Sequence, residues 1–115
     1  MDEKKINSPT LVESQCTACQ GGVEPLKGKE IEELLGQLSQ GWQVIDEHHL
    51  EREYMFGNFS QALEFVNKVG LLAELLGHHP NIYLSWGKVK LMIWTHKING
   101  LHKNDFILAA RVNEL

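Results

Sequence analysis

The chain has 115 residues, enough for one domain with a single hydrophobic core. Its composition, 43% hydrophobic and 23% charged, is ordinary for a globular protein, and no apolar run approaches the roughly 20 residues of a membrane span. The net charge is −4, and no stretch gathers lysine and arginine, which argues against direct binding to nucleic acid. Met1 and the four charged residues 2–5 are followed by no apolar signal region, so we expect a cytoplasmic protein.

Residues 1–25 show no periodicity, and we expect a loosely ordered extension followed by a single domain at residues 26–115. The extension contains Cys16 and Cys19 in a Cys-x-x-Cys arrangement. A structural zinc site needs four ligands and a thioredoxin-like site needs a strand-to-helix setting, and the sequence offers neither around this pair. A loop disulfide or an inert pair is therefore the favoured interpretation, and a zinc ion shared between two chains stays open.

The residues after this extension show first helical and then strand periodicity. Apolar residues recur at the i, i+3, i+4, i+7 spacing of an amphipathic helix, which we expect to end near Gly41. Residues 42–56 alternate between apolar and polar side chains on both sides of a polar turn at residues 46–49, which predicts a β-hairpin. The helical positions are Ile31, Leu34, Leu35 and Leu38.

A longer helix should follow, because Asn58 or Ser60 can cap its start and Gly77 suits its end. Pro80 prevents the helix from continuing. The apolar stripe of this helix is wide, which predicts that the helix forms the centre of the core. The stripe consists of Ala62, Phe65, Val66, Val69, Leu72, Ala73 and Leu76, broadened by Leu63, Leu71 and Leu75.

A second hairpin is expected at residues 82–96, with its turn at Gly87 and Lys88, and a last helix should run from about Lys103 to Glu114. The order helix, hairpin, helix, hairpin, helix predicts an α+β fold. In this fold a four-stranded, mostly antiparallel sheet carries about three helices on one face, in the order α-β-β-α-β-β-α. The buried side of the last helix should consist of Phe106, Ala109, Ala110 and Val112.

The histidines at the end of the long helix are the first candidates for chemistry, because histidine titrates near neutral pH. Glu74 and His78 are four residues apart, so they can be neighbours across the last helical turn. His79 precedes Pro80, which biases His79 toward an extended conformation. The His-His pair should therefore lie where the helix becomes a strand, held by the scaffold and still in reach of solvent.

A third histidine, His96, is expected to end the last strand on the same side as Trp94, away from the main aliphatic row. Three histidines can also hold a metal. However, neighbours on an extended chain point to opposite sides, so His78 and His79 suit a shared zinc poorly unless a bend brings them together. We expect no metal site.

Other polar residues have structural interpretations. Asp105 lies three residues after His102, where a carboxylate completes a helix-capping arrangement and complements the helix dipole. His102 and Lys27 stand where a serine or threonine cap is usual, which weakens the prediction of where these two helices begin. His48 and His49 form a second pair in the first hairpin turn, and we interpret them as surface residues.

The candidate residues form a specific motif: a Glu-x-x-x-His-His-Pro run at residues 74–80, then Thr95-His96, then Gly100-Leu101 followed by Asp105. This motif resembles the signature of the pterin-4a-carbinolamine dehydratases, and the resemblance covers roughly residues 24–115. It implies an α+β hydro-lyase that works as a homodimer or homotetramer on 4a-hydroxytetrahydropterin, the compound released when aromatic amino acid hydroxylases use a tetrahydropterin cofactor. Such enzymes expel water to give quinonoid dihydropterin and recycle the tetrahydropterin without a metal or organic cofactor.

The resemblance also implies roles for single residues. His78, His79 and His96 match the active-site histidines of the family, and Glu74 and Asp105 match acidic positions that support them. Within the same motif, the residues expected to support the site or bind substrate also include Pro80 and Thr95.

The chemistry suits these residue types. Loss of the 4a-hydroxyl requires one proton to reach that oxygen and another to leave N5, and a histidine near its reference pKa of about 6.5 can perform either transfer. Our hypothesis is that His79 and His96 transfer protons, that His78 positions or polarises the pterin, and that Glu74 and Asp105 orient the imidazoles. Which histidine is the acid stays open.

Two alternative functions remain. Animal members of the family also serve as dimerisation cofactors for a homeodomain transcription factor, so a binding module of that kind is one alternative. The second alternative is that the protein acts on a different pterin, such as molybdopterin, since the site would accommodate the same ring system. We expect neither direct nucleic-acid binding nor a membrane partner in either case.

Overall fold

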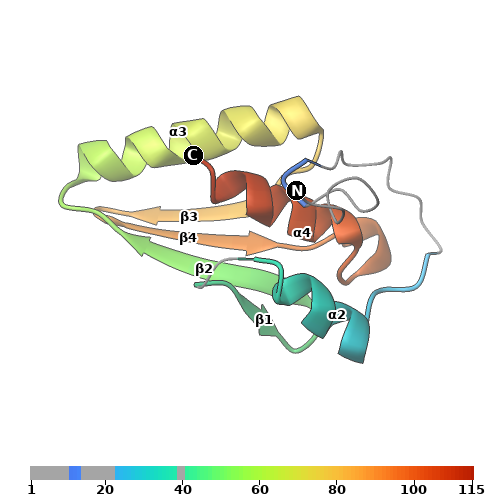
Figure 1. Cartoon of the computed structure of the whole chain (residues 1–115). Coiled ribbons are helices and arrows are strands. Elements are labelled where there is room, and N and C mark those ends of the chain that lie inside the picture. The colour runs from blue at the N-terminus through green and yellow to red at the C-terminus, as the bar shows by residue number, and fades with distance from the viewer. Residues whose placement is uncertain (1–10, 14–22, 39–40) are drawn as a thin grey trace, which may run out of the picture.

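The computed structural model describes residues 11–13, 23–38 and 41–115. The predicted Cys-x-x-Cys pair, Cys16 and Cys19, lies outside the described residues. The elements follow the predicted order α-β-β-α-β-β-α, which confirms the α+β fold class (Figure 1). They are α2 (Gly28–Leu35), β1 (Gln43–Ile45), β2 (His49–Met55), α3 (Phe59–Leu76), β3 (Asn81–Ser85), β4 (Lys88–Ile93), the 3-10 turn η1 (His96–Ile98) and α4 (Lys103–Val112).

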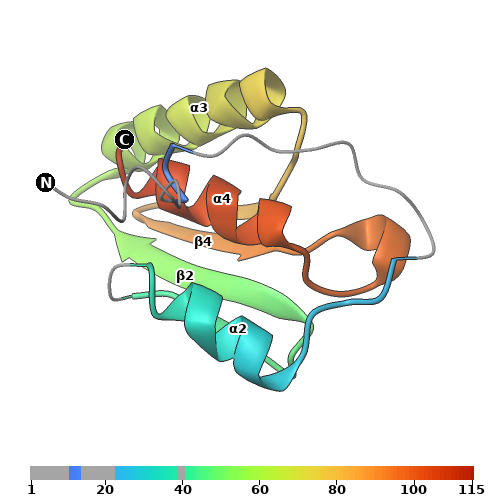
Figure 2. The ribbon, with the colours of Figure 1, turned by 45° about the vertical axis from the view of Figure 1, so that its right-hand side comes forward.

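The four strands form one sheet in the order β1-β2-β4-β3, and all three pairings are antiparallel. The register pairs Leu50 with Ile93, and these two residues are fully buried with Val89 and Leu91. The helices cover the face that carries these side chains (Figure 2). The opposite face of β2 and β4 is polar, as the ion pair between Lys90 and Glu51 at 3.6 Å illustrates. The alternation of strand residues thus separates core from surface.

Helix α4, and not α3, is the most buried helix of the described chain. Eight of its ten residues are buried, because α4 lies between α2 and α3 over the middle of the sheet (Figure 2). The prediction that α3 forms the centre of the core is therefore wrong. Helix α3 packs over the sheet side formed by β3 and β4 and leaves the outer part of its apolar stripe in solvent. The exposed members of the stripe are Leu63, Leu71 and Leu75.

The predicted caps of α3 are confirmed. The Asn58 side chain accepts a hydrogen bond from the backbone N–H of Gln61 at 2.8 Å, which satisfies one of the free donors at the helix start. Gly77 follows the last helical residue in the left-handed region, with φ at 68°. The backbone N–H groups of Gly77 and His78 bond to Glu74 and Ala73, the paired bonds of a glycine-terminated helix.

Three predicted boundaries differ from the structure. Helix α2 ends at Leu35 and not near Gly41. The second hairpin turns at Trp86 and Gly87, one residue earlier than predicted, since Ser85 already pairs with Lys88. A Cβ at Gly87 would lie 2.7 Å from the Phe56 carbonyl oxygen, so this turn position requires glycine. Finally, β4 ends at Ile93, so His96 does not end a strand but begins η1.

Residues 11–13 lie beside the helix layer. Leu11 is buried within the hydrophobic core, and the Val12 carbonyl accepts a hydrogen bond from Arg111 Nε at 2.6 Å. This contact ties the start of the chain to the end of α4. No helix in the described part of the chain is both long and apolar enough to cross a bilayer.

Among the buried side-chain nitrogen and oxygen atoms of the described residues, the Tyr54 hydroxyl lacks a partner. The hydroxyl of Tyr54 makes no hydrogen bond within the described residues, and burial raises the pKa of Tyr54 to about 12 against the opposing effect of the nearby Arg52. The Arg52 guanidinium lies 4.7 Å from the centre of the Tyr54 ring, and its Nη1 donates to Asn113 at 3.0 Å. The Tyr54 ring thus has a cation–π contact with Arg52, whereas the Tyr54 hydroxyl has no hydrogen bond within the described residues.

Candidate active site

The left-handed turn at Gly77 directs His78 back into the helix layer. His78 is 8% exposed, and its Nε2 lies 2.6 Å from Oδ1 of Asp105 on α4. An ionised carboxylate only accepts hydrogen bonds, so Nε2 is the donor and a neutral His78 ring keeps Nδ1 as its acceptor. The contact therefore fixes both the orientation and the tautomer of the His78 ring.

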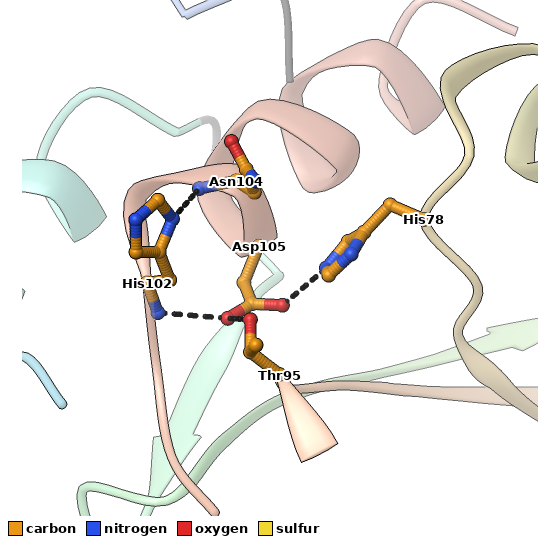
Figure 3. A network of polar contacts seen from close by, with 5 residues as sticks. All are labelled: His78, Thr95, His102, Asn104 and Asp105. Atoms are coloured by element: carbon orange, nitrogen blue, oxygen red, sulfur yellow. Dashed lines mark hydrogen bonds and ion pairs between the residues drawn. The ribbon is translucent and has the colours of Figure 1, made fainter. Parts of the chain in front are cut away.

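Asp105 connects three segments of the chain and is fully buried (Figure 3). Besides His78, its carboxylate accepts hydrogen bonds from the Thr95 hydroxyl at 2.9 Å and from the His102 backbone N–H at 2.8 Å. It lies in the first turn of α4, where the helix dipole also favours a negative charge. Three hydrogen-bond donors and the dipole of the helix start thus offset the free-energy cost of burying this carboxylate.

The capping role predicted for Asp105 is confirmed, and His102 completes it. Nδ1 of His102 accepts from the backbone N–H of Asn104 at 3.1 Å, so a histidine occupies the place where serine or threonine is usual (Figure 3). At the start of α2, Lys27 provides no side-chain cap. The same aspartate therefore both starts α4 and holds the His78 ring.

His79 points the other way and pairs with Glu74. Its Nε2 lies 2.5 Å from Oε2 of Glu74, and the two side chains are 59% and 76% exposed. The expected neighbour of Glu74 was His78, and this expectation is wrong. The left-handed Gly77 turns His78 inward, and His79, five residues after Glu74, takes its place on the outside.

An open groove of about 640 Å³ lies beside this pair, between α3 and the start of β3. Its wall combines the polar His79–Glu74 pair with mostly apolar side chains, a combination typical of small-molecule sites. The residues that line the groove are Val66, Asn67, Gly70, Leu71, Ala73, Glu74, His79, Pro80 and Ile82.

His96 belongs to neither of these hydrogen-bonded groups. It is exposed at the start of η1, and its ring contacts Trp94 edge-to-face at 4.4 Å and 71°. No hydrogen bond joins His96 to His78 or His79 within the described residues. The connection runs through its neighbour Thr95, which is buried, bonds to Gly100 across the η1 turn and donates to Asp105.

The structure thus gathers the predicted residues into one buried network, His78 with Thr95 and Asp105, and one exposed pair, His79 with Glu74. His48 and His49, which were expected to be surface residues, also make ring contacts and are only partly exposed. Both rings contact Trp94, at 5.0 and 5.7 Å between centroids. No periodicity signals this contact, because it depends on the register between β2 and β4. Among the described residues, no three metal-ligating side chains are grouped so as to hold a metal ion.

Comparison with known proteins identifies the family. The family profile described as pterin 4 alpha carbinolamine dehydratase matches residues 24–115. The chain belongs to this dehydratase family. The predicted family and its reaction class, that of a hydro-lyase, are therefore confirmed.

Similar proteins support the same assignment. The chain is 53% identical over 105 residues to a protein of Rubrobacter xylanophilus that is assigned as a pterin-4-alpha-carbinolamine dehydratase, covering 91% of this chain and 97% of that one. It is 50% identical over 111 residues to a protein of Methylococcus capsulatus with the same assignment, covering 96% of each. A solved structure from Brucella melitensis, described as a transcriptional coactivator/pterin dehydratase, matches with a TM-score of 0.72 at 33% identity over 79% of this chain and 97% of that one.

Proposed function

We propose that this protein dehydrates 4a-hydroxytetrahydropterin to quinonoid dihydropterin by acid–base catalysis and thereby recycles a tetrahydropterin cofactor. The observation that carries the proposal is the contrast between two adjacent histidines. His78 is buried and bonded to Asp105, whereas His79 is exposed beside an open groove and bonded to Glu74. One ring is thus fixed within the scaffold, and the other is available to a substrate.

The proposed reaction balances as a simple elimination. A histidine acid delivers a proton to the 4a-oxygen, the C4a–O bond breaks to release water, and the N5 lone pair forms the C4a=N5 bond. A histidine base removes the N5 proton, and proton exchange with solvent restores both groups. Each positioned group contributes about 10²–10⁴-fold, or roughly 3–5 kcal/mol, to the lowering of the barrier.

We assign the two proton transfers to His79 and His96. Glu74 accepts from Nε2 of His79, which leaves Nδ1 as the nitrogen that can exchange a proton with the substrate. Both ring nitrogens of His96 are free of hydrogen bonds within the described residues. We assign to His78 the role of positioning the pterin, because its Nε2 is committed to Asp105 and Nδ1 is the ring nitrogen that remains for a substrate contact.

A spectrophotometric assay with synthetic 4a-hydroxytetrahydropterin tests the proposed activity. The purified protein should accelerate loss of the substrate well above its spontaneous dehydration, at the same rate before and after treatment with a chelator. Acid–base catalysis by histidine requires no metal, so chelation has nothing to remove. No acceleration would contradict the proposed activity, and activity that is lost on chelation and restored by a divalent metal would contradict the mechanism.

We also propose that the protein is a homo-oligomer. Leu71 and Leu75 on the outer face of α3 are 72% and 78% exposed, and Leu63 on the same helix is exposed as well. Large apolar side chains that share a surface favour a protein–protein contact. The area around these three leucines is therefore the proposed contact between copies of the chain.

A coactivator role is the second candidate. The description of the Brucella melitensis structure, which is 33% identical to this chain, names a transcriptional coactivator as well as a pterin dehydratase. A catalytically inactive variant, such as His79→Ala, distinguishes the two functions. If the protein acts as a coactivator, this variant should still bind the transcription factor it serves, and loss of that binding together with activity would argue against a separate role.

A further inference from the structure

Four aromatic rings form a cluster that joins the start of β2 to the residues after β4. Trp94, just after β4, contacts His96 at 4.4 Å, His48 at 5.0 Å and His49 at 5.7 Å between ring centroids. His48 lies in the turn before β2, and His49 begins β2. Two segments of the chain, residues 48–49 and residues 94–96, therefore meet at Trp94, which has no role in the proton transfers described above.

The contact with Trp94 is the ring contact that His96 makes within the described part of the chain. His96 is exposed, and within the described residues its ring makes no hydrogen bond. An unrestrained histidine samples about six orientations, from three χ1 wells and two ring flips. Proton transfer needs the ring within hydrogen-bond distance of one substrate atom, so a freely rotating ring would be productive only part of the time.

Trp94 is also in contact with His48 and His49, and these two residues make polar contacts of their own. Nδ1 of His48 lies 3.0 Å from Nδ1 of His49, and Nε2 of His48 lies 3.0 Å from Oδ1 of Asn99. Asn99 closes the η1 turn, because its backbone N–H bonds to the His96 carbonyl at 3.1 Å. The His48–Asn99 bond thus connects the first hairpin turn to the turn that carries His96, and both His48 and His96 contact Trp94.

We propose that Trp94 is a positioning residue that holds the His96 ring in its productive orientation, and that the contacts of His48 and His49 in turn hold Trp94 in place. The proposal rests on the proposed role of His96 in proton transfer. Trp94 thus acts through His96 and contacts neither the 4a-oxygen nor N5 of the substrate. Its effect should therefore fall on kcat, with KM changed little.

Two substitutions at Trp94 test this role. Trp94→Leu removes the ring and should lower kcat about five- to tenfold, in line with about six ring orientations, with KM within twofold of the wild type. Trp94→Phe keeps an aromatic contact and should restore kcat to within about twofold of the wild type. Trp86→Leu, which removes an exposed tryptophan in the β3–β4 turn, is the matched control and should change neither constant.

A spectroscopic readout on the His96 ring separates this proposal from the proposed function. In the wild type, nuclear Overhauser contacts should connect the His96 ring protons to the Trp94 indole, and Trp94→Leu should shift the His96 resonance while leaving that of His79 in place. A wild type without these contacts, or a Trp94→Leu variant that folds and keeps the kcat of the wild type, would overturn the proposal. If the wild type lacks dehydratase activity, the proposed function fails and the resonances alone decide whether Trp94 holds His96.

Discussion

Nε2 of His78 lies 2.6 Å from Oδ1 of Asp105, and this contact joins the end of α3 to the start of α4 across 27 residues of sequence. Both side chains are buried, so the contact belongs as much to the core as to the site. The hydrogen bonds of Asp105 therefore couple stability to the orientation of the His78 ring.

Asp105→Asn should lower the free energy of unfolding by about 3 kcal/mol. The amide oxygen can still accept from Thr95 and from the His102 backbone N–H, which share Oδ2, but the amide nitrogen only donates. The charge-assisted bond from Nε2 of His78 to Oδ1 is therefore lost, and the His78 ring must change its tautomer to bond to the amide. Thr95→Val removes a single donor and should cost only about 1 kcal/mol. Urea unfolding measures both values. Equal stability of Asp105→Asn and the wild type would show that the network does not hold the fold.

Glu74→Gln should lower kcat about three- to tenfold and leave the free energy of unfolding within about 1 kcal/mol of the wild type. The amide can still accept from His79, but it removes the negative charge that stabilises an imidazolium at this exposed position. Steady-state kinetics and urea unfolding provide the two measurements. Glu64→Gln, at an exposed position on the same helix, is the matched control. Wild-type kcat in Glu74→Gln would exclude a role for Glu74.

Tyr54→Phe should stabilise the protein by about 1 kcal/mol at neutral pH, because it removes a buried hydroxyl that has no partner among the described residues. This gain should grow in alkaline solution. The folded-state pKa of about 12 lies above the unfolded value of 10, so between pH 10 and 12 the unfolded tyrosine releases its proton while the folded one keeps it.

The stability of the wild type should therefore fall as the pH rises above 10, and the contribution of Tyr54 to this fall should be absent in Tyr54→Phe. Urea unfolding of both proteins at pH 8 and pH 11 gives the comparison, since all other titrating groups are shared. A stability difference that is the same at both pH values would contradict the raised pKa of Tyr54.

The double variant Leu71→Glu and Leu75→Glu should dissociate the proposed oligomer, because charged side chains would be forced into an apolar contact. Light scattering should give a multiple of the 13.1 kDa chain mass for the wild type and a smaller mass for the variant. Lys68→Glu alters the charge of the same helix at an exposed position and should leave the mass unchanged. A monomeric wild type would refute the proposed oligomer.

Much of the fold could be predicted from local signals. Asn58 and Gly77 mark the ends of α3 because capping geometry depends on single residues, and alternation along β4 identifies Val89, Leu91 and Ile93 as its buried side. The greater burial of α4 could not be predicted. An apolar stripe shows that a helix has a face to bury, but it does not show where over the sheet that helix packs.

The site could be predicted only in part, for a related reason. Spacing indicates that Glu74 and His78 can meet, but the backbone turn at Gly77 decides that His79 is the partner of Glu74. The partnership of His78 with Asp105 depends on how α4 packs, and the contact of Trp94 with His48 depends on the strand register. None of these three-dimensional relationships appears in a one-dimensional pattern.

The most direct test of acid–base dehydration is the turnover of synthetic 4a-hydroxytetrahydropterin by His79→Ala and by His96→Ala, measured beside the wild type. Each substitution removes one proton-transfer group, so each should lower kcat at least tenfold while the free energy of unfolding changes little at these exposed positions. If both variants turn over the substrate at the wild-type rate, these histidines do not carry the protons and the proposed mechanism is wrong.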